Sequence, residues 1–235
     1  SVLGPPPLGG WVPHMDVSVV VPAFGGQHKL DLTLASLAAQ SYPPSLMEVV
    51  VVDDGSDPPL RLPALRPDRT RLVRAPQGGW GPGHAYAAGV AATSGTVVLR
   101  LDADVVAGRR HVEAHMRWHH RTGSALVTGR LVYTEALLGV RPEELHRQVG
   151  TEGVDDLVGD DRGTMAWIER ILARTDTLRE AGHKAWEICI GATFSVSRSF
   201  LDELGGVDTS MVLGEDSELA HRLVQRGAVV VPELE

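Results

Sequence analysis

The sequence VVLRLDADVV, residues 97–106, decides the fold class and the position of the candidate site. Its first half is a nearly continuous apolar run, which is typical of a β-strand buried on both faces of a sheet. Asp102 and Asp104 follow two residues apart, so they lie on the same side of an extended chain. Two carboxylates this close repel each other unless a cation neutralises them, and oxygen ligands suit Mg²⁺ or Mn²⁺. The alternative is that the two aspartates only end the strand and cap the following helix.

The same pattern of a buried strand followed by polar residues occurs earlier in the chain. Residues 17–22, VSVVVP, form a β-branched run that a proline stops, and residues 47–54, MEVVVVDD, form a second run. Leucines at helical spacing separate the two runs, so we expect a strand–helix–strand unit with parallel strands and a right-handed crossover. In such sheets ligands bind beyond the carboxyl ends of the strands. The sequence therefore predicts an α/β fold with a site where three strand ends meet.

The length and composition fit one large α/β domain of 235 residues. A proline- and glycine-rich leader, residues 1–15, is expected to be flexible, and a single domain is expected to occupy residues 16–235. Residues 135–184 carry few strand signals. We expect this insertion to close over the site or to select the substrate.

Charge and cysteine content exclude several classes of protein. The net charge of −8 and the lack of a basic run argue against a nucleic-acid partner. The single cysteine, Cys189, excludes an internal disulfide and fits a reducing compartment. No apolar stretch is long enough to span a bilayer, and no signal-peptide pattern is visible. We therefore expect a cytoplasmic protein.

Residues 77–84, QGGWGPGH, form a glycine-rich link. It would let the backbone approach a ligand near Gly83, with Trp80 as a lid or a sugar platform. The alternative is a flexible surface loop. The link matches neither the phosphate-binding Walker loop nor the dinucleotide pattern. Farther along, Gly191 in the strand-like segment 186–196 would allow close approach of a ligand or of another backbone.

His111, His115 and His119 form one stripe of a predicted helix. Two histidines four residues apart can hold zinc. No acidic partner of the His-Glu-x-x-His type accompanies them, which favours a solvated or partly packed helix face.

Glu215 and Asp216 lie in the first turn of another predicted helix, where the positive helix end favours an ionised carboxylate. An ionised carboxylate is what a base for a hydroxyl acceptor must be. Acids are also common at helix starts without any such role.

Four motifs in order resemble those of the GT-A glycosyltransferases, and within them the large inverting family 2. The resemblance covers residues 17–232, and the motifs are VVVPAF (19–24), VVDDGS (51–56), LDAD (101–104) and GGVD (205–208) leading to GED (214–216).

The resemblance implies a GT-A fold with a Rossmann-like, mostly parallel central sheet flanked by helices. It implies that residues 16–106 bind a nucleotide sugar and that residues 107–235 bind the acceptor. It also implies roles for individual residues. The nucleotide-binding residues would be Pro22, Ala23, Phe24, Asp54, Gly83, Asp102 and Ala103, the metal ligands Asp104 and Asp102, and the donor and acceptor pocket Trp80, Trp186, Gly191 and Ala192.

The implied reaction is an inverting transfer of a sugar from a nucleotide-diphosphate donor, most often a UDP-sugar, to an acceptor nucleophile. Asp216, with Glu215 beside it, would supply the general base, and Mn²⁺ or Mg²⁺ on Asp104 would bridge the diphosphate. The acceptor stays open among glycans, peptides, lipids and small natural products, and so does the oligomeric state. Many family members have a metal-contacting histidine beyond the last strand. The sequence stops at Glu235 before such a residue, so we expect either a longer chain or the absence of that ligand.

Three other functions compete with this one. A sugar nucleotidyltransferase needs a basic residue close after the first strand, which residues 22–26 lack. A phosphatase with an Asp-x-Asp nucleophile carries that motif on its first strand. The third is a nucleotide-sugar-binding module without catalysis, against which Asp104 and Asp216 argue.

Overall fold

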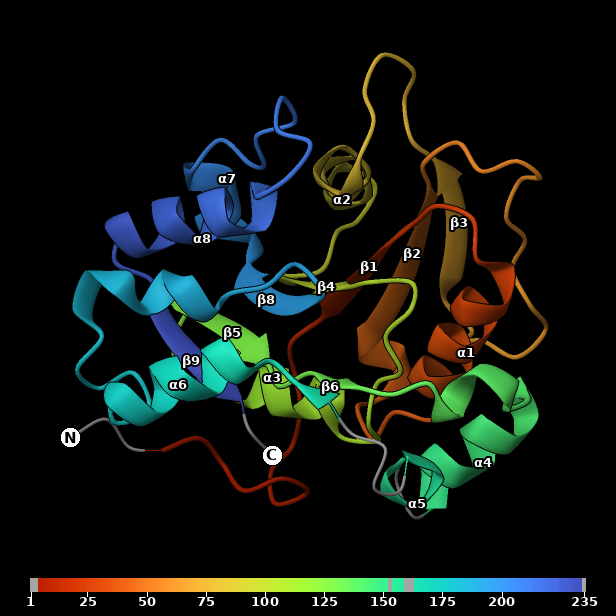
Figure 1. Cartoon of the computed structure of the whole chain (residues 1–235), viewed down its shortest axis with the longest axis horizontal. Coiled ribbons are helices and arrows are strands. Elements are labelled where there is room, and N and C mark those ends of the chain that lie inside the picture. The colour runs from red at the N-terminus through yellow and green to blue at the C-terminus, as the bar shows by residue number, and fades with distance from the viewer. Residues whose placement is uncertain (1–3, 152–153, 159–162, 234–235) are drawn as a thin grey trace.

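A seven-stranded sheet forms the centre of the protein (Figure 1). The structure is a computed structural model that describes residues 4–151, 154–158 and 163–233. The strand order is β3-β2-β1-β4-β8-β5-β9; β8 is antiparallel to both of its neighbours, and all other pairs are parallel. The strands are β1 (Val17–Ala23), β2 (Met47–Asp53), β3 (Thr70–Arg74), β4 (Val97–Leu101), β5 (Ala125–Gly129), β8 (Thr193–Ser197) and β9 (Val229–Glu233), and β6 (Val132–Tyr133) pairs with β7 (Gly163–Thr164) in a separate small sheet.

Helices cover both faces of the sheet. The helices of the described residues are α1 (Gln27–Ala38), α2 (Pro82–Ala91), α3 (His111–His119), α4 (Pro142–Thr151), α5 (Asp155–Val158), α6 (Ala166–Arg174), α7 (Arg198–Glu203) and α8 (Glu215–Gln225), with short 3-10 helices η1 (Pro44–Leu46), η2 (Ala136–Gly139) and η3 (Gly182–Ile188). Helices α1 and α3 pack on one face, and α2, α7 and α8 pack on the other (Figure 1). The predicted α/β class with a mostly parallel sheet is confirmed.

The valine runs form strands because both of their faces are covered. In β1, Val19 and Val21 belong to the apolar cluster with α1 and α3, and Val20 belongs to the cluster with α2, α7 and α8. Alternate side chains of a strand point to opposite faces, so a run of valines fills both cores.

The predicted strand–helix–strand unit is confirmed. Strands β1 and β2 are parallel, and their register runs from Val17 opposite Met47 to Ala23 opposite Asp53. Their carboxyl ends are therefore level. Strand β4 lies on the other side of β1, so residues that follow β1, β2 and β4 meet at one edge of the sheet.

The structure differs from the sequence-based expectation in segment 186–196, and it adds a packing contact for the insertion, residues 135–184. The strand-like segment 186–196 begins with the end of η3, and only its second half is strand β8, because Ala185 and Ile188 pack with α6 in a separate apolar cluster. In the insertion, α4 packs against α1 through Leu145 and Val149, which contact Leu32.

The predicted leader contacts the domain in its described part; residues 1–3 lie outside it. The Gly9 N–H donates to the carboxylate of Glu113 on α3, and Trp11 Nε1 donates to the same oxygen at 3.2 Å. The Trp11 ring also lies edge-on to His120, with 4.4 Å between ring centroids.

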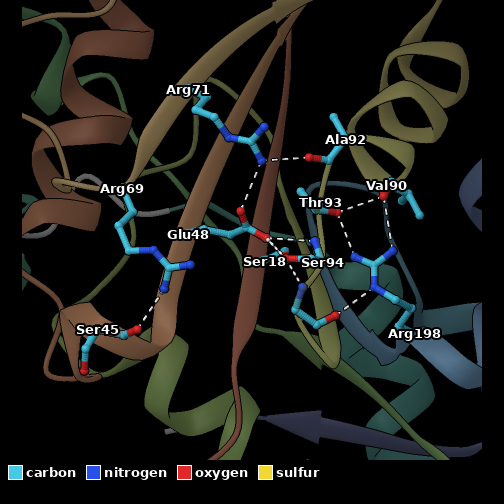
Figure 2. A network of polar contacts seen from close by, with 11 residues as sticks. Ser18, Ser45, Glu48, Arg69, Arg71, Val90, Ala92, Thr93, Ser94 and Arg198 are labelled. Carbon is cyan, nitrogen blue, oxygen red and sulfur yellow. Dashed lines mark hydrogen bonds and ion pairs between the residues drawn. The ribbon is translucent and has the colours of Figure 1, made fainter.

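The opposite, amino-terminal edge of the sheet is closed by a polar network (Figure 2). Glu48 is 8% exposed and accepts hydrogen bonds from Ser18 Oγ at 2.7 Å, Ser94 N at 2.9 Å and Arg71 at 3.1 Å. Arg198 donates to Val90 O and other acceptors at the end of α2. Each of these charges has its partners within the network, which marks this edge as structural.

No helix in the described part of the chain is both long enough and apolar enough to cross a membrane.

Candidate functional site

A cavity of about 330 Å³ lies where the carboxyl ends of β1, β2 and β4 meet the glycine-rich link. Its lining contains many of the predicted nucleotide- and metal-binding residues. The lining residues are Pro22, Ala23, Phe24, Gly25, Gly26, Lys29, Asp54, Trp80, Gly81, Pro82, Ala85, Asp102, Ala103 and Asp104.

Two aromatic side chains form the rim of this cavity. Phe24 is 63% exposed and Trp80 is 57% exposed, and their ring centroids are 6.4 Å apart with the planes at 86°. Exposed aromatic rings beside a cavity offer flat apolar faces to a ligand. Asp54 Oδ2 accepts a hydrogen bond from Gly81 N at 2.8 Å, and this bond holds the loop that carries Trp80 beside the end of β2.

The acids that follow β4 differ in exposure. The Asp104 side chain is 58% exposed and lies 3.4 Å from Lys29 Nζ, whereas the Asp102 side chain is 32% exposed. Burial raises the pKa of Asp102, and the charges of Asp104 and Glu215 raise it further, while Arg100 acts in the opposite direction.

The chemistry of these two acids fits a hard divalent cation, because both carboxylates line the cavity and repel each other there. Among the residues that the structure describes, no group of three or more His, Cys, Asp or Glu side chains could hold a metal ion. A cation at this site would therefore take further ligands from a bound substrate or from water.

Arg100 is the residue of this region that the sequence reasoning missed. It is 3% exposed on β4; its Nε lies 3.1 Å from Asp102 Oδ1, and its Nη1 lies 3.0 Å from Glu215 Oε1. The available signal was an arginine inside an otherwise apolar buried strand, because a buried charge requires a partner.

Glu215 and Asp216 have different environments although they are adjacent. Glu215 is 5% exposed, and its carboxylate is bound to Arg100. Asp216 is half-buried: its Oδ2 accepts from Gly191 N at 2.6 Å, and its Oδ1 accepts from Ser217 N at 2.7 Å. Two backbone donors thus fix the orientation of the Asp216 carboxylate.

The segment Gly191–Ala192 connects Asp216 to the cavity. The carbonyl of Ala192 accepts a hydrogen bond from Asp102 N at 2.9 Å, and Gly191 donates to Asp216. Acids from the middle and from the end of the chain therefore gather at one edge of the sheet. Neither Glu215 nor Asp216 lines the cavity itself.

Gly83 and Trp186 lie outside the cavity lining. A Cβ atom at Gly83 would lie 2.8 Å from Glu215 Cγ, so this glycine permits the close approach of α2 to α8. Trp186 is partly buried in the core, and its ring centroid is 5.4 Å from that of His221 on α8.

The histidine stripe of α3 faces the interior. The expected solvated or partly packed face is not found at His115 and His119, which are fully packed: they are 0% and 4% exposed and share the hydroxyl of Ser195 at 2.9 and 2.8 Å. His111 Nε2 lies 2.9 Å from Thr193 Oγ1. Burial lowers the pKa of all three rings, so they stay neutral and help to pack α3 against β8.

Known proteins resemble this chain in sequence and in structure. Residues 18–205 match the sequence profile of the family described as "Glycosyl transferase family 2". The chain is 28% identical over 231 residues to a validoxylamine A glucosyltransferase from Streptomyces hygroscopicus subsp. limoneus. That alignment covers 94% of this chain and 51% of the relative. An uncharacterized glycosyltransferase of a Nostoc species is 36% identical over 97 residues, which cover 39% of this chain and 29% of that protein. The chain thus spans about half the length of one of these curated relatives, and its alignment with the other is shorter.

Solved structures share the fold. The mannosyltransferase PcManGT from Pyrobaculum calidifontis, in complex with GDP-Man and Mn²⁺, has a TM-score of 0.63 at 21% identity; 99% of this chain and 59% of that chain are covered. Residues 1–349 of S. aureus TarS, in complex with UDP-GlcNAc, have a TM-score of 0.63 at 16% identity, with 93% and 56% covered.

Proposed function

Because this chain belongs to glycosyl transferase family 2, we propose that it transfers a sugar from a nucleotide-diphosphate donor to an acceptor nucleophile, with inversion at the anomeric carbon. One observation supports this proposal above the others. The cavity at the carboxyl ends of β1, β2 and β4 combines an aromatic rim with the acids Asp54, Asp102 and Asp104.

In this proposal the nucleotide occupies the cavity. The nucleobase lies against Ala23 and Phe24, and its N–H groups donate to Asp54, whose second oxygen is not engaged by Gly81. Trp80 covers the base or the sugar from the opposite rim. The neighbouring folds were solved with a guanosine and with a uridine donor, so both bases belong in the test.

The diphosphate lies toward Asp102 and Asp104 in this proposal. Asp104 and Asp102 would hold Mn²⁺ or Mg²⁺ there, and such an ion would supply positive charge to stabilise the leaving diphosphate. Lys29 lines the same part of the cavity, and its ammonium group adds positive charge beside the phosphates. Pairing of Lys29 with Asp104 is exposed and therefore weak, so the lysine is readily released to a phosphate.

We assign the base to Asp216. The carboxylate is oriented by Gly191 N and Ser217 N, and it is half-buried and forms no ion pair with any residue that the structure describes. It removes the proton of the acceptor while the acceptor attacks the anomeric carbon opposite the nucleotide. Glu215 is held by Arg100 inside the protein, so this assignment leaves Glu215 outside the proton transfer.

The test is a thermal-shift panel followed by an activity assay. UDP-, GDP- and dTDP-sugars are added with and without Mn²⁺. A ligand that binds only the native state stabilises that state, so the matching donor should raise the melting temperature, and it should do so more when Mn²⁺ is present. Hydrolysis or transfer of that donor is then measured. Binding without any turnover would indicate a nucleotide-sugar-binding module, and no binding of any donor would refute the proposal.

A further inference from the structure

Arg100 lies at the junction between the donor cavity and helix α8, and no step of the proposed reaction uses it. Its guanidinium group contacts Asp102 in the cavity wall and Glu215 at the start of α8. Asp102 and Glu215 are 113 residues apart in the sequence, and Arg100 joins them with two separate nitrogen atoms. Its carbon Cζ also lies 5.6 Å from the ring centroid of Tyr86, which is fully buried.

Two glycines make the space for this ion-paired group. A Cβ atom at Gly191 would lie 2.8 to 3.0 Å from Nη2, Cζ and Nη1 of Arg100, and a Cβ at Gly83 would lie 2.8 Å from Glu215 Cγ. Real Cβ atoms do not approach other atoms so closely. The backbone of Gly191 is therefore packed directly on the guanidinium group, and the same residue donates its N–H to Asp216.

Stability alone does not account for this arrangement. Desolvating a buried arginine and its acids opposes much of their attraction, so apolar residues of similar volume often stabilise a protein equally well. Geometry is what a planar guanidinium adds, because its fixed fork of N–H donors holds two acids in defined directions. A single lysine ammonium group at this position would reach one of the two acids.

We propose that Arg100 is a positioning residue that fixes the base relative to the donor. It holds Asp102 on the donor side, and through Glu215 and the Gly191 backbone it holds the first turn of α8, which carries Asp216. This inference rests on the proposed function for its effect on turnover, whereas its effect on the position of α8 is independent of any reaction.

The experiment compares Arg100→Lys with Arg198→Lys. Arg198 is the control because it is a partly buried arginine at the opposite, amino-terminal edge of the sheet, bound to the end of α2 (Figure 2). Two readouts are taken: amide hydrogen exchange of residues 190–192 and 214–218, and the separate effects on kcat and on nucleotide binding.

We expect Arg100→Lys to speed exchange in those two segments at least about tenfold, because local opening becomes easier. We expect kcat to fall about 10²-fold, the scale of a small misplacement of a reacting group. Nucleotide affinity, measured with UDP or GDP and Mn²⁺, should change less than about threefold, since the lysine keeps a charge beside Asp102. Arg198→Lys should leave exchange in both segments and kcat unchanged.

A second variant keeps the proposal testable if Arg100→Lys does not fold. Glu215→Gln keeps an acceptor of the same size for Arg100, and it should show the same kcat-selective loss at smaller amplitude. The double variant should lose no more kcat than Arg100→Lys alone, because both changes break the same contact between Arg100 and Glu215.

Unchanged exchange in Arg100→Lys, or faster exchange with wild-type kcat, would overturn the positioning role. A wild-type protein that turns over no donor would refute the proposed function instead, and hydrogen exchange alone would then decide whether Arg100 positions α8.

Discussion

Replacing His119 by glutamine is expected to make the fold less sensitive to acid. His119 is 4% exposed and shares the Ser195 hydroxyl with His115. Burial, with a smaller contribution from the neighbouring His120, lowers the pKa of His119 from its usual 6.5 to about 3. Glutamine can keep a hydrogen bond to Ser195 but does not titrate.

The sign and size of the effect follow from proton binding. Between pH 6.5 and pH 3 the ring takes up a proton in the unfolded chain and stays neutral in the folded protein. Its contribution to stability is therefore fully present above the unfolded pKa and is lost as the pH falls toward the folded pKa. For these two pKa values, lowering the pH from 8 to 5 reduces the free energy of unfolding by about 2 kcal/mol through this one group.

Urea denaturation followed by tryptophan fluorescence at pH 8 and pH 5 measures this difference. The wild-type protein should lose about 2 kcal/mol more of its unfolding free energy than His119→Gln between the two pH values. His183→Gln is the control, because His183 is an exposed histidine. If wild type and His119→Gln lose the same free energy, His119 is not held neutral by burial.

Three further predictions concern the site and the core. Asp216→Asn should lower kcat about 10²- to 10⁴-fold and leave nucleotide binding intact, as measured by steady-state kinetics and calorimetry; equal activity would remove Asp216 from the mechanism. Asp104→Ala should abolish the gain in nucleotide affinity that Mn²⁺ gives, and an affinity that responds to Mn²⁺ as in wild type would contradict a metal role for Asp104. Gly89→Ala should cost about 1–3 kcal/mol of unfolding free energy, because its Cβ would lie 2.2 Å from Val20 Cγ1, whereas Gly150→Ala, with open space around it, should be neutral or stabilising; equal stability of the two variants would refute the packing argument.

The sequence by itself determined the architecture around the site. Valine runs of strand length predicted strands covered on both faces, and the βαβ order placed their carboxyl ends together, because one parallel crossover leaves little choice of direction. Residues at or just after the carboxyl ends of β1, β2 and β4, such as Pro22, Asp54 and Asp104, line the cavity, as the order of these strands requires. These features depend on period and sequence order, which local reasoning can evaluate.

Only the tertiary structure decided which of the charged groups pair. Glu215 and Asp216 are equivalent in the sequence, yet one binds Arg100, 115 residues away, and the other accepts from Gly191. Likewise, the polar partner of two histidines of the stripe is Ser195 on β8, which lies 80 residues from His115 and 76 residues from His119 in the sequence. Helical and strand periods show which side of an element is apolar, but they do not show what the opposite wall presents. The partner of a buried charge is fixed only when the strands and helices are assembled, since desolvation penalises every arrangement in which that charge is left alone.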